Sequence, residues 1–533
     1  MTESPNERTV LSAFTEYRRA APDATAVQYY GNRISRAELD ALSDALATWF
    51  AEEQVGAGDR VAVALQNTPV FAIALLATWK LGAVLVPVSP MLRTGELASL
   101  LVDCGARVMI AHPEMADVVN PALAQLEHSP TVLWSSPSDL AGDLDAPWPT
   151  NPDFVPATGT SFLPELNRVR KPVGLHESSS SDLALLVYTS GTTGPSKGAM
   201  LTHANVSNQA FVTPDCFGLT SSDTILTIAP FFHITGLCMH LALGLGNGLP
   251  LVMTYRFEPQ QVLELIRRYT PSFTVGTITA FIALAEQAAS SEQAQAALSR
   301  MTSTYSGGAA VPAAVVDRYE QQFGVYIRNG YGLTEAASVC VAVPIGERAP
   351  IDRDSGATSI GRPLPGVTVT IVADDGTEAP HGTTGEIVIR GPQVGNGYWN
   401  RQEETANTFR PTGLHTGDVG IIDGQGWIYV VDRKKDLIVV SGYKVWPRDV
   451  EDVLYRHPSV AEAAVIGVPD SYRGESVAAY VVPRPGTTIT SDELNQHCRE
   501  QLSAYKCPRS YEIVSTLPKS ASGKILRRLL RAD

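Results

Sequence analysis

YTSGTTGPSKGAM, residues Tyr188–Met200, is the most informative local pattern in this chain. It follows the apolar run Asp182–Val187, which predicts a buried strand, and it gathers glycines and hydroxyl residues around Lys197. Glycines let backbone N–H groups converge on an anion, hydroxyls add donors, and the lysine adds a positive charge. A Walker A loop has a second glycine five residues after its first, whereas Ser196 follows Gly191 at that spacing. The pattern predicts a phosphate-binding loop and disfavours a P-loop NTPase; composition alone leaves a plain flexible loop open.

Helix and strand patterns alternate on both sides of this loop. Glu38–Phe50 places apolar residues at helical spacing, and short apolar runs fit buried strands. The alternation continues through these segments: Arg60–Leu65, Ala83–Val88, Thr224–Ile228, Gln260–Tyr269 and Ser272–Val275. It predicts an α/β fold with largely parallel sheets. The most apolar region, Val70–Val88, is interrupted by Lys80 and Pro87, so it predicts a buried helix followed by a strand and not a membrane span.

Three segments depart from this alternation. Residues His128–Asp182 are rich in Pro, Ser and Asp and predict a long exposed connection. Ala280–Met301 is rich in Ala and Gln and predicts a surface helical region. Past Gly361 strand and turn patterns dominate, with a β-hairpin expected around Asp375–Gly376. A β-rich subdomain is therefore expected after the α/β part.

The last part of the chain predicts a small α+β domain. The charged run Asp432–Asp436 lies between two strand patterns and indicates an exposed junction. Pro447 can start a helix, and strand patterns follow at Ala463–Val468 and Ser476–Val482, before a helix at Ser491–Leu502. This domain follows the β-rich part directly.

Composition limits the class of protein. The 533 residues fit about three domains at roughly 100–200 residues each. A net charge of −14 and a pI near 5.3 argue against nucleic-acid binding. The six cysteines have no zinc-like spacing, so reduced structural thiols are expected. The polar start, MTESPNERTV, lacks the apolar stretch of a signal peptide, which predicts a cytoplasmic protein.

The order of residues in TSGTTGPSKG resembles the signature loop of the adenylate-forming superfamily, which includes acyl-CoA synthetases, peptide-synthetase adenylation domains and firefly luciferases. The resemblance covers nearly the whole chain. Further motifs occur in the family's order: WKLGAVLVPV (Trp79–Val88), APFFHITGL (Ala229–Leu237), YSGGAA (Tyr305–Ala310), NGYGLTE (Asn329–Glu335), HTGD (His415–Asp418), DRKKDLIVVSGYKV (Asp432–Val445) and PKSASGK (Pro518–Lys524).

The resemblance implies an ATP- and Mg²⁺-dependent ligase that converts a hydrophobic carboxylic acid (fatty, aryl or bulky polycyclic) to an acyl-AMP and then transfers the acyl group to coenzyme A (CoA). An N-terminal domain over residues 1–431 would bind the acid and ATP, with the β-rich subdomain at about 340–431. Residues 432–436 would form a hinge, with Lys435 as the hinge residue. Residues 437–533 would form a mobile C-terminal domain.

The resemblance also implies the nucleotide contacts. Tyr331 would stack on adenine and Thr334 would touch the α-phosphate, although a helix N-cap is the ordinary interpretation of that threonine. Glu335 and Thr192 would hold Mg²⁺, which prefers carboxylate and phosphate oxygens. The implied nucleotide- and CoA-binding positions are Thr189, Ser190, Gly191, Thr192, Thr193, Gly194, Lys197, Gly308, Ala309, Asn329, Gly330, Tyr331, Gly332, Asp418, Arg433, Gly442 and Lys444.

Within that set, Asp418 and Arg433 resemble the residues that hold the ribose hydroxyls. Leu414 replaces the aromatic residue often found before HTGD, which puts local packing in question. Lys524 matches the lysine that bridges the carboxylate and the α-phosphate, where a cation offsets charge in the transition state. A solvated basic tail is its ordinary interpretation. After acyl-AMP forms, rotation about the hinge would exchange the Lys524 loop for the face Ser441–Lys444.

The acid is expected to bind beside His233, which corresponds to the aromatic position at the mouth of the family's acyl pocket. A lone histidine is more often structural. By family position, the pocket lining would include Gly307, Gly308, Ala309, Gly332 and Ala336–Cys340. These residues are small, which predicts a roomy apolar pocket.

Several alternatives remain at this stage. A ligase that loads a separate carrier protein shares every motif, and a homodimer is left open. Amino-acid adenylation is disfavoured, because Ile234-Thr235 stands where an aspartate usually binds the substrate ammonium. Luciferase-type oxygenation shares the fold, which does not settle chemistry. An inactive nucleotide-binding scaffold is disfavoured by the presence of Lys197, Glu335 and Lys524.

Overall fold

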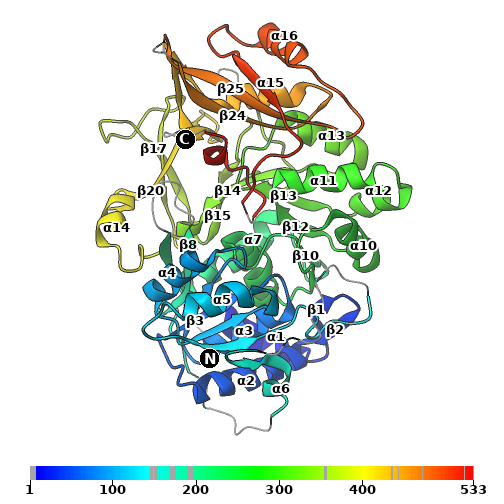
Figure 1. Ribbon diagram of the computed structural model, residues 1–533, viewed down its shortest axis with the longest axis vertical. Helices are drawn as coiled ribbons and strands as arrows, with labels where there is room; N and C mark the ends of the chain where they lie inside the picture. Colours follow the sequence, from blue (N-terminus) through cyan, green and yellow to red (C-terminus); the bar gives the residue numbers. More distant parts are fainter. Residues whose placement is uncertain are drawn as a thin grey trace.

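A computed structural model gives the architecture of the chain (Figure 1). The model describes residues 8–144, 148, 154, 156–168, 174, 176–189, 196–352, 357–433, 436–441, 443–470, 472–520 and 522–531. Within these residues the chain forms four β-sheets with helices packed against them. The blue N-terminal part and the orange C-terminal part lie at opposite ends of the long axis, and the red final segment returns toward the green strands in the middle (Figure 1).

The first sheet contains the strand that precedes the signature loop. Its order across the described residues is β7-β6-β5-β3-β4-β8-β9, parallel except for β9. Helix α3 is buried along its whole length, as its apolar sequence predicts. The elements of this part are α1 (Val10–Ala20), α2 (Arg36–Glu52), β3 (Arg60–Ala64), α3 (Pro69–Lys80), β4 (Val84–Pro87), α4 (Thr94–Cys104), β5 (Val108–Ala111), α5 (Ala116–Leu123), β6 (Thr131–Trp134), β7 (Thr160–Ser161), α6 (Phe162–Leu166), β8 (Leu183–Thr189) and β9 (Lys197–Thr202).

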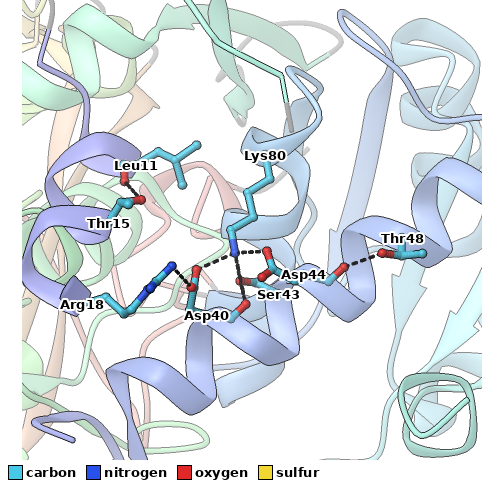
Figure 2. Close-up of polar contacts among 8 residues, drawn as sticks. All are labelled: Leu11, Thr15, Arg18, Asp40, Ser43, Asp44, Thr48 and Lys80. Atoms are coloured by element: carbon cyan, nitrogen blue, oxygen red, sulfur yellow. Dashed lines mark hydrogen bonds and ion pairs between the residues drawn. The ribbon is translucent and has the colours of Figure 1, made fainter. Parts of the chain in front are cut away.

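Lys80, the last residue of α3, places a charge inside this core. Its side chain is 3% exposed, and its Nζ lies 2.7 Å from Asp40 Oδ1, 2.6 Å from Asp44 Oδ1 and 2.8 Å from Ser43 Oγ, all on α2 (Figure 2). Arg18 of α1 lies 2.7 Å from the other carboxylate oxygen of Asp40. A buried charge is tolerated only when it is paired in this way. The cluster therefore ties α1, α2 and α3 together.

The second sheet lies beside the first and runs β16-β15-β14-β13-β12-β10-β11-β1-β2 in the described residues. Strands β10 to β14, together with β1, are parallel, whereas β15, β16 and β2 are antiparallel to their neighbours. Its elements are β1 (Thr25–Tyr29), β2 (Asn32–Ser35), α7 (His203–Phe217), β10 (Ile225–Thr227), α8 (Ile234–Gly236), a π-helical turn (Leu237–Ala242), α9 (Leu243–Asn247), β11 (Leu251–Met253), α10 (Pro259–Tyr269), β12 (Phe273–Gly276), α11 (Ile278–Ala288), α12 (Glu292–Leu298), β13 (Ser303–Gly307), α13 (Ala313–Phe323), β14 (Arg328–Leu333), β15 (Ser338–Ala342) and β16 (Arg362–Pro363).

Two smaller sheets complete the molecule. The expected hairpin is present, since β17 pairs antiparallel with β18 and Gly376 takes a positive φ in the connection between them. The elements are β17 (Thr368–Val372), β18 (Gly385–Arg390), α14 (Gln402–Thr408), β19 (Phe409–Arg410), β20 (Gly413–Ile422), β21 (Ile428–Arg433), β22 (Ile438–Val440), β23 (Tyr443–Val445), α15 (Pro447–Arg456), β24 (Val460–Asp470), β25 (Gly474–Pro483), α16 (Ser491–Gln501) and β26 (Ser510–Ile513).

The C-terminal part is hydrogen-bonded to the rest of the molecule through main-chain carbonyls. Thr279 Oγ1, on α11, donates to the carbonyl of Gly523 at 3.1 Å. Arg318, on α13, donates to the carbonyl of Tyr455 at 3.1 Å. In the opposite direction, Arg448 of α15 donates to two main-chain carbonyls of the β-rich region. These contacts hold one defined arrangement of the two parts.

The α/β fold class is confirmed, and two local expectations are wrong in part. The segment 128–182 was expected to be exposed, but it contains β6 and the buried side chains of Trp134 and Phe162. The strand has only four residues, so it does not stand out from the Pro/Ser/Asp-rich composition around it. The Ala/Gln-rich region was expected on the surface, yet α11 buries Phe281 and Leu284. Small residues between these side chains mask its apolar face.

Four other expectations concern the cysteines, membrane spans, the packing at Leu414 and the domain limits. All six cysteines are free. No helix in the described part of the chain is long and apolar enough to cross a membrane. Leu414 is buried in the core of the β-rich sheet, where it packs among apolar side chains. The domain limits at residues 431, 436 and 437 stay predictions.

Candidate active site

Many of the predicted site residues lie along one edge of the second sheet. The parallel strands β12, β13 and β14 end at Gly276, Gly307 and Leu333, and the chain turns away from the sheet after each of them. In α/β sheets, ligands bind at this carboxyl edge. The predicted positions on or beside it are Gly308, Ala309, Asn329, Gly330, Tyr331, Gly332, Thr334 and Glu335.

Lys524 reaches this edge from the C-terminal part of the chain. Gly308 has a φ of +79°, and a Cβ built on it would lie 2.5 Å from Cε and 3.1 Å from Nζ of Lys524. Only glycine permits this close approach. The Lys524 loop is also closed on itself, since the backbone N–H of Ser520 donates to the Lys524 carbonyl at 2.7 Å. The fold thus brings together two predicted site residues that are distant in sequence.

His233 lies near Lys524 and is uncharged at neutral pH. Burial, followed by the nearby Lys524 ammonium, lowers the pKa of His233 to about 3. Its Nδ1 accepts a hydrogen bond from the backbone N–H of Thr235 at 3.3 Å, at the start of α8. The π-helical turn that follows, Leu237–Ala242, is buried, and π-turns are frequent at functional sites. His233 therefore presents a neutral imidazole within an apolar wall.

Tyr331 and Asp418 form a partly buried pair from two different sheets. The Tyr331 hydroxyl donates to Oδ2 of Asp418 at 2.6 Å. Burial and the Asp418 carboxylate raise the pKa of Tyr331, so the phenol keeps its proton. Asp418 is the cross-strand partner of Arg433 in the β20–β21 ladder, which places the Arg433 main chain beside it. The adenine and ribose positions implied by the resemblance are therefore neighbours.

Glu335 contacts a tyrosine that the sequence did not single out. The Tyr398 hydroxyl donates to Glu335 Oε1 at 2.6 Å, and Nζ of Lys197 lies 5.3 Å from the centre of the Tyr398 ring. Tyr398 reaches this place because it pairs with Ala199 of β9 in an isolated β-bridge. It therefore connects the lysine of the signature loop to the expected metal-binding carboxylate. The aromatic pair in GNGYWN was its signal in the sequence.

The two described ends of the signature loop lie side by side. Thr189 and Lys197 are cross-strand partners in the antiparallel pair β8–β9, so the loop closes between them. The predicted phosphate- and metal-binding residues within the loop lie outside the described residues, as do two positions nearer the C-terminus. These are Ser190, Gly191, Thr192, Thr193, Gly194, Lys435 and Gly442.

The small residues expected to make the acyl pocket roomy have another explanation. A Cβ on Gly332 would lie 1.5 Å from the Ser338 carbonyl oxygen, and one on Gly307 would lie 2.6 Å from that of Gly330. These glycines are required by the close approach of neighbouring strands. The segment Ala336–Cys340 is buried within the cores. Backbone packing is therefore sufficient to explain the glycines at these positions, and the roomy apolar pocket stays a prediction.

A second concave site lies on the C-terminal part, beside the face expected to bind CoA. A cavity of about 260 Å³ lies between β22, β23, β25 and the segment before β26. The rings of Tyr443 and Tyr505 stack in its wall with centroids 4.9 Å apart, and Arg473 and Arg509 also line it. Lys444 follows Tyr443 in the β23 backbone. The cavity therefore combines aromatic faces with positive charge.

Magnesium fits this site only in combination with phosphate. Among the described residues, no group of three or more His, Cys, Asp and Glu side chains is arranged to hold a metal. Glu335 has one oxygen bonded to Tyr398, and Oε2 accepts no hydrogen bond from the described residues. Because Mg²⁺ is commonly bound by one or two carboxylates together with substrate phosphates and water, a single such carboxylate fits Mg²⁺ bound to ATP.

Comparison with known proteins identifies the family. Residues 14–399 match the model of the AMP-binding enzymes, and residues 449–524 match that of the AMP-binding enzyme C-terminal domain. The chain belongs to the AMP-binding enzyme family. It is an AMP-forming acid–thiol ligase that uses ATP, Mg²⁺ and CoA.

Individual relatives of the ligase are CoA ligases with different acids. The chain is 35% identical to a long-chain-fatty-acid–CoA ligase of Bacillus subtilis, over 99% of this chain and 94% of that protein. It is 37% identical to a feruloyl-CoA synthase of Amycolatopsis sp., over 96% of each chain. Its fold matches the anthranilate CoA ligase AuaEII in complex with anthranoyl-AMP, with a TM-score of 0.88 and 25% identity over 99% of this chain and 98% of that one. These relatives thus include ligases of fatty acids and of aryl acids.

Proposed function

We propose that the ligase activates a hydrophobic carboxylic acid as an acyl-AMP at the carboxyl edge of the second sheet, and that Lys524 promotes this step. The supporting observation is the position of Lys524, which lies against Gly308 and close enough to His233 to depress its pKa. A lysine held there stands between the nucleotide contacts of β14 and the apolar wall around His233.

In the first half-reaction, a carboxylate oxygen of the acid attacks the α-phosphorus of ATP. The bond from that phosphorus to pyrophosphate breaks, and pyrophosphate leaves. Two negatively charged groups must approach, so a fixed cation beside them lowers the barrier. Lys524 supplies that cation, while Tyr331, Thr334 and Asp418 hold the nucleotide. Positioning and electrostatics suffice, because the carboxylate is itself the nucleophile.

In the second half-reaction, the CoA thiol attacks the acyl carbonyl, and AMP leaves with the electron pair of the broken C–O bond. The C-terminal domain rotates about the hinge at Lys435 and presents the face Ser441–Lys444 in place of the Lys524 loop. The cavity behind that face supports this assignment. Stacked tyrosines suit a purine, and arginines suit phosphates.

The acid is hydrophobic and carries no ammonium beside its carboxylate. Ile234 and Thr235 follow His233, and neither offers a charge partner to an amino group. An ammonium buried there would be unpaired and unfavourable. The side chains of Phe231, Phe232 and Ile234 are buried in the main core next to His233. Fatty and aryl acids both suit such surroundings.

The test combines purified protein, ATP, Mg²⁺ and CoA with short, long, aromatic and polycyclic acids. AMP and acyl-CoA are measured by mass spectrometry, with Lys524→Ala as the matched control. Acyl-CoA that is lost in the control supports the proposal and identifies the acid. Formation of acyl-AMP without acyl-CoA would indicate that the acyl acceptor is a carrier protein and not CoA. An absence of ATP turnover with every acid would overturn the proposal.

A further inference from the structure

The Lys524 loop is held in place by a pair of threonines that none of the family motifs in the sequence contains. The loop contacts the start of α11, where Thr277 is the N-cap residue and Thr279 lies in the first turn. The hydroxyl of Thr279 donates to the main-chain carbonyl of Gly523 at 3.1 Å. Gly523 is the residue immediately before Lys524.

The two threonine hydroxyls act as one unit. Their oxygens lie 2.9 Å apart. Because Thr279 gives its proton to the Gly523 carbonyl, the proton between the threonines belongs to Thr277, which donates to Thr279. In such a chain each hydrogen bond polarises and strengthens the next. The pair therefore offers the loop a stronger donor than a single hydroxyl.

The loop is shaped to match this pair. Gly523 has a φ of +82°, and a Cβ built on it would lie 2.9 Å from Oγ1 of Thr277. Within the loop, the N–H of Gly523 donates to the Ser520 carbonyl at 2.9 Å, and the N–H of Lys524 donates to Ser520 Oγ at 3.1 Å. The turn is therefore preformed, and the threonines fix where it sits on the N-terminal part.

We propose that Thr279, oriented by Thr277, is a positioning residue for the adenylation half-reaction. It holds the Gly523 carbonyl, and through it places Lys524 over Gly308. It touches neither the acid nor the nucleotide. This inference rests on the proposed two-step reaction, in which the Lys524 loop leaves the site before thioester formation. Thr279 should therefore matter to one half-reaction only.

The test measures the two half-reactions separately in the full-length enzyme. Adenylation is followed by ATP–pyrophosphate exchange, and the thioester step by supplying synthetic acyl-AMP with CoA. For Thr279→Val, we expect the kcat of adenylation to fall about tenfold, the scale of one lost hydrogen bond. The KM for ATP and the rate of the thioester step should not change. Thr279→Ser keeps the hydroxyl and should retain adenylation.

Two further variants separate positioning from general structural damage. Thr302→Val changes an exposed threonine just before β13 and should leave both half-reactions intact. In a Lys524→Ala background, Thr279→Val should have no further effect on residual adenylation, because the loop then carries no cation to position. An additional loss in that background, or an equal loss in both half-reactions, would overturn the inference.

The outcome also distinguishes the two proposals. If the wild-type enzyme shows no exchange with any acid, the proposed function fails. If the wild type is active and Thr279→Val adenylates as fast as the wild type, the function stands and the positioning role is overturned. Equal losses in Thr279→Ser and Thr279→Val would also contradict it, since the serine hydroxyl can make the same hydrogen bond.

Discussion

The C-terminal domain has two faces, one for each half-reaction of the proposed mechanism, and they differ in what covers them. On one face, Lys524 packs against Gly308, and the loop before it is bound by Thr279. On the other, Tyr443 is 59% exposed and stacks on Tyr505 at the wall of an open cavity. The domain thus turns its lysine toward the site while its aromatic and cationic face meets solvent.

In the proposed mechanism, this difference lets one domain take part in two chemical steps. Adenylation brings anions together and needs a fixed cation. Thioester formation needs a site for a thiol and for the nucleotide that carries it. Because the two sets of residues lie on separate faces, a change on one face should alter one half-reaction and spare the other.

The largest effect is expected when the packed face loses its charge. Lys524→Ala should lower the rate of adenylation about 10²- to 10³-fold, the usual range for loss of one transition-state partner. The thioester step from supplied acyl-AMP should stay near the wild-type rate. ATP–pyrophosphate exchange and acyl-CoA formation measure the two steps. A comparable loss in the rates of adenylation and of thioester formation would show that the two faces do not serve separate steps.

A change distant from both faces should lower stability without altering the ratio of the two half-reaction rates. Lys80→Ala removes the buried ammonium and leaves Asp40 with Arg18 alone, so we expect the free energy of unfolding to fall by about 3 kcal/mol. Urea unfolding measures this loss. The ratio of the two half-reaction rates should not change in the folded variant. Asp44→Asn, at a side chain 48% exposed, is the control and should cost under about 1 kcal/mol.

Changes on the open face should impair the thioester step and leave adenylation unaffected, the reverse of changes on the packed face. Tyr443→Ala and Arg509→Ala remove an aromatic wall and a positive charge from the cavity. We expect each to raise the KM for CoA about tenfold, on the scale of one stacking or charge contact. Pyrophosphate exchange should be unaffected. An unchanged KM for CoA in both variants would place the CoA nucleotide elsewhere.

The smallest effect concerns the pKa of His233, which reports on the nearby lysine. Burial is the larger cause of its value of about 3, and Lys524 adds to it. Lys524→Met should therefore raise this pKa while burial keeps it below 6.5. Because the folded pKa lies below that of the unfolded chain, folding stability falls as pH drops from about 6.5 toward 3, and in the variant it falls over a narrower pH range and by less in total. NMR titration of the His233 ring measures the shift.

Much of the fold was predictable from patterns that are local in sequence. The strand and loop before Lys197, and the buried helix in the apolar region around Lys80, follow from glycine content and apolar runs. The ordered motifs located Lys524, Glu335 and Asp418, which the fold then places near their predicted neighbours. Their chemical roles stay predictions.

The remainder depended on contacts between distant segments. Tyr398 approaches Glu335 through a bridge to Ala199, and the aromatic pair in GNGYWN marks Tyr398 without indicating either partner. Thr279 gains its partner only when the end of the chain folds back onto α11. The glycines of β13 and β14 predicted a roomy pocket. The structure adds a second reason for small residues there, the close approach of neighbouring strands, which the sequence does not show.

The use of main-chain carbonyls between the two parts of the molecule bears on how such enzymes diverge and how they can be recombined. Thr279 and Arg318 recognise the carbonyls of Gly523 and Tyr455, and every residue type supplies a carbonyl. Side chains on the C-terminal surface that contributes these carbonyls can therefore change in evolution without loss of these hydrogen bonds. We expect a hybrid that joins this N-terminal domain to the C-terminal domain of a relative to keep its choice of acid. The N-terminal domain, proposed to select the acid, and the C-terminal domain, proposed to deliver the thiol, could then be exchanged independently between relatives.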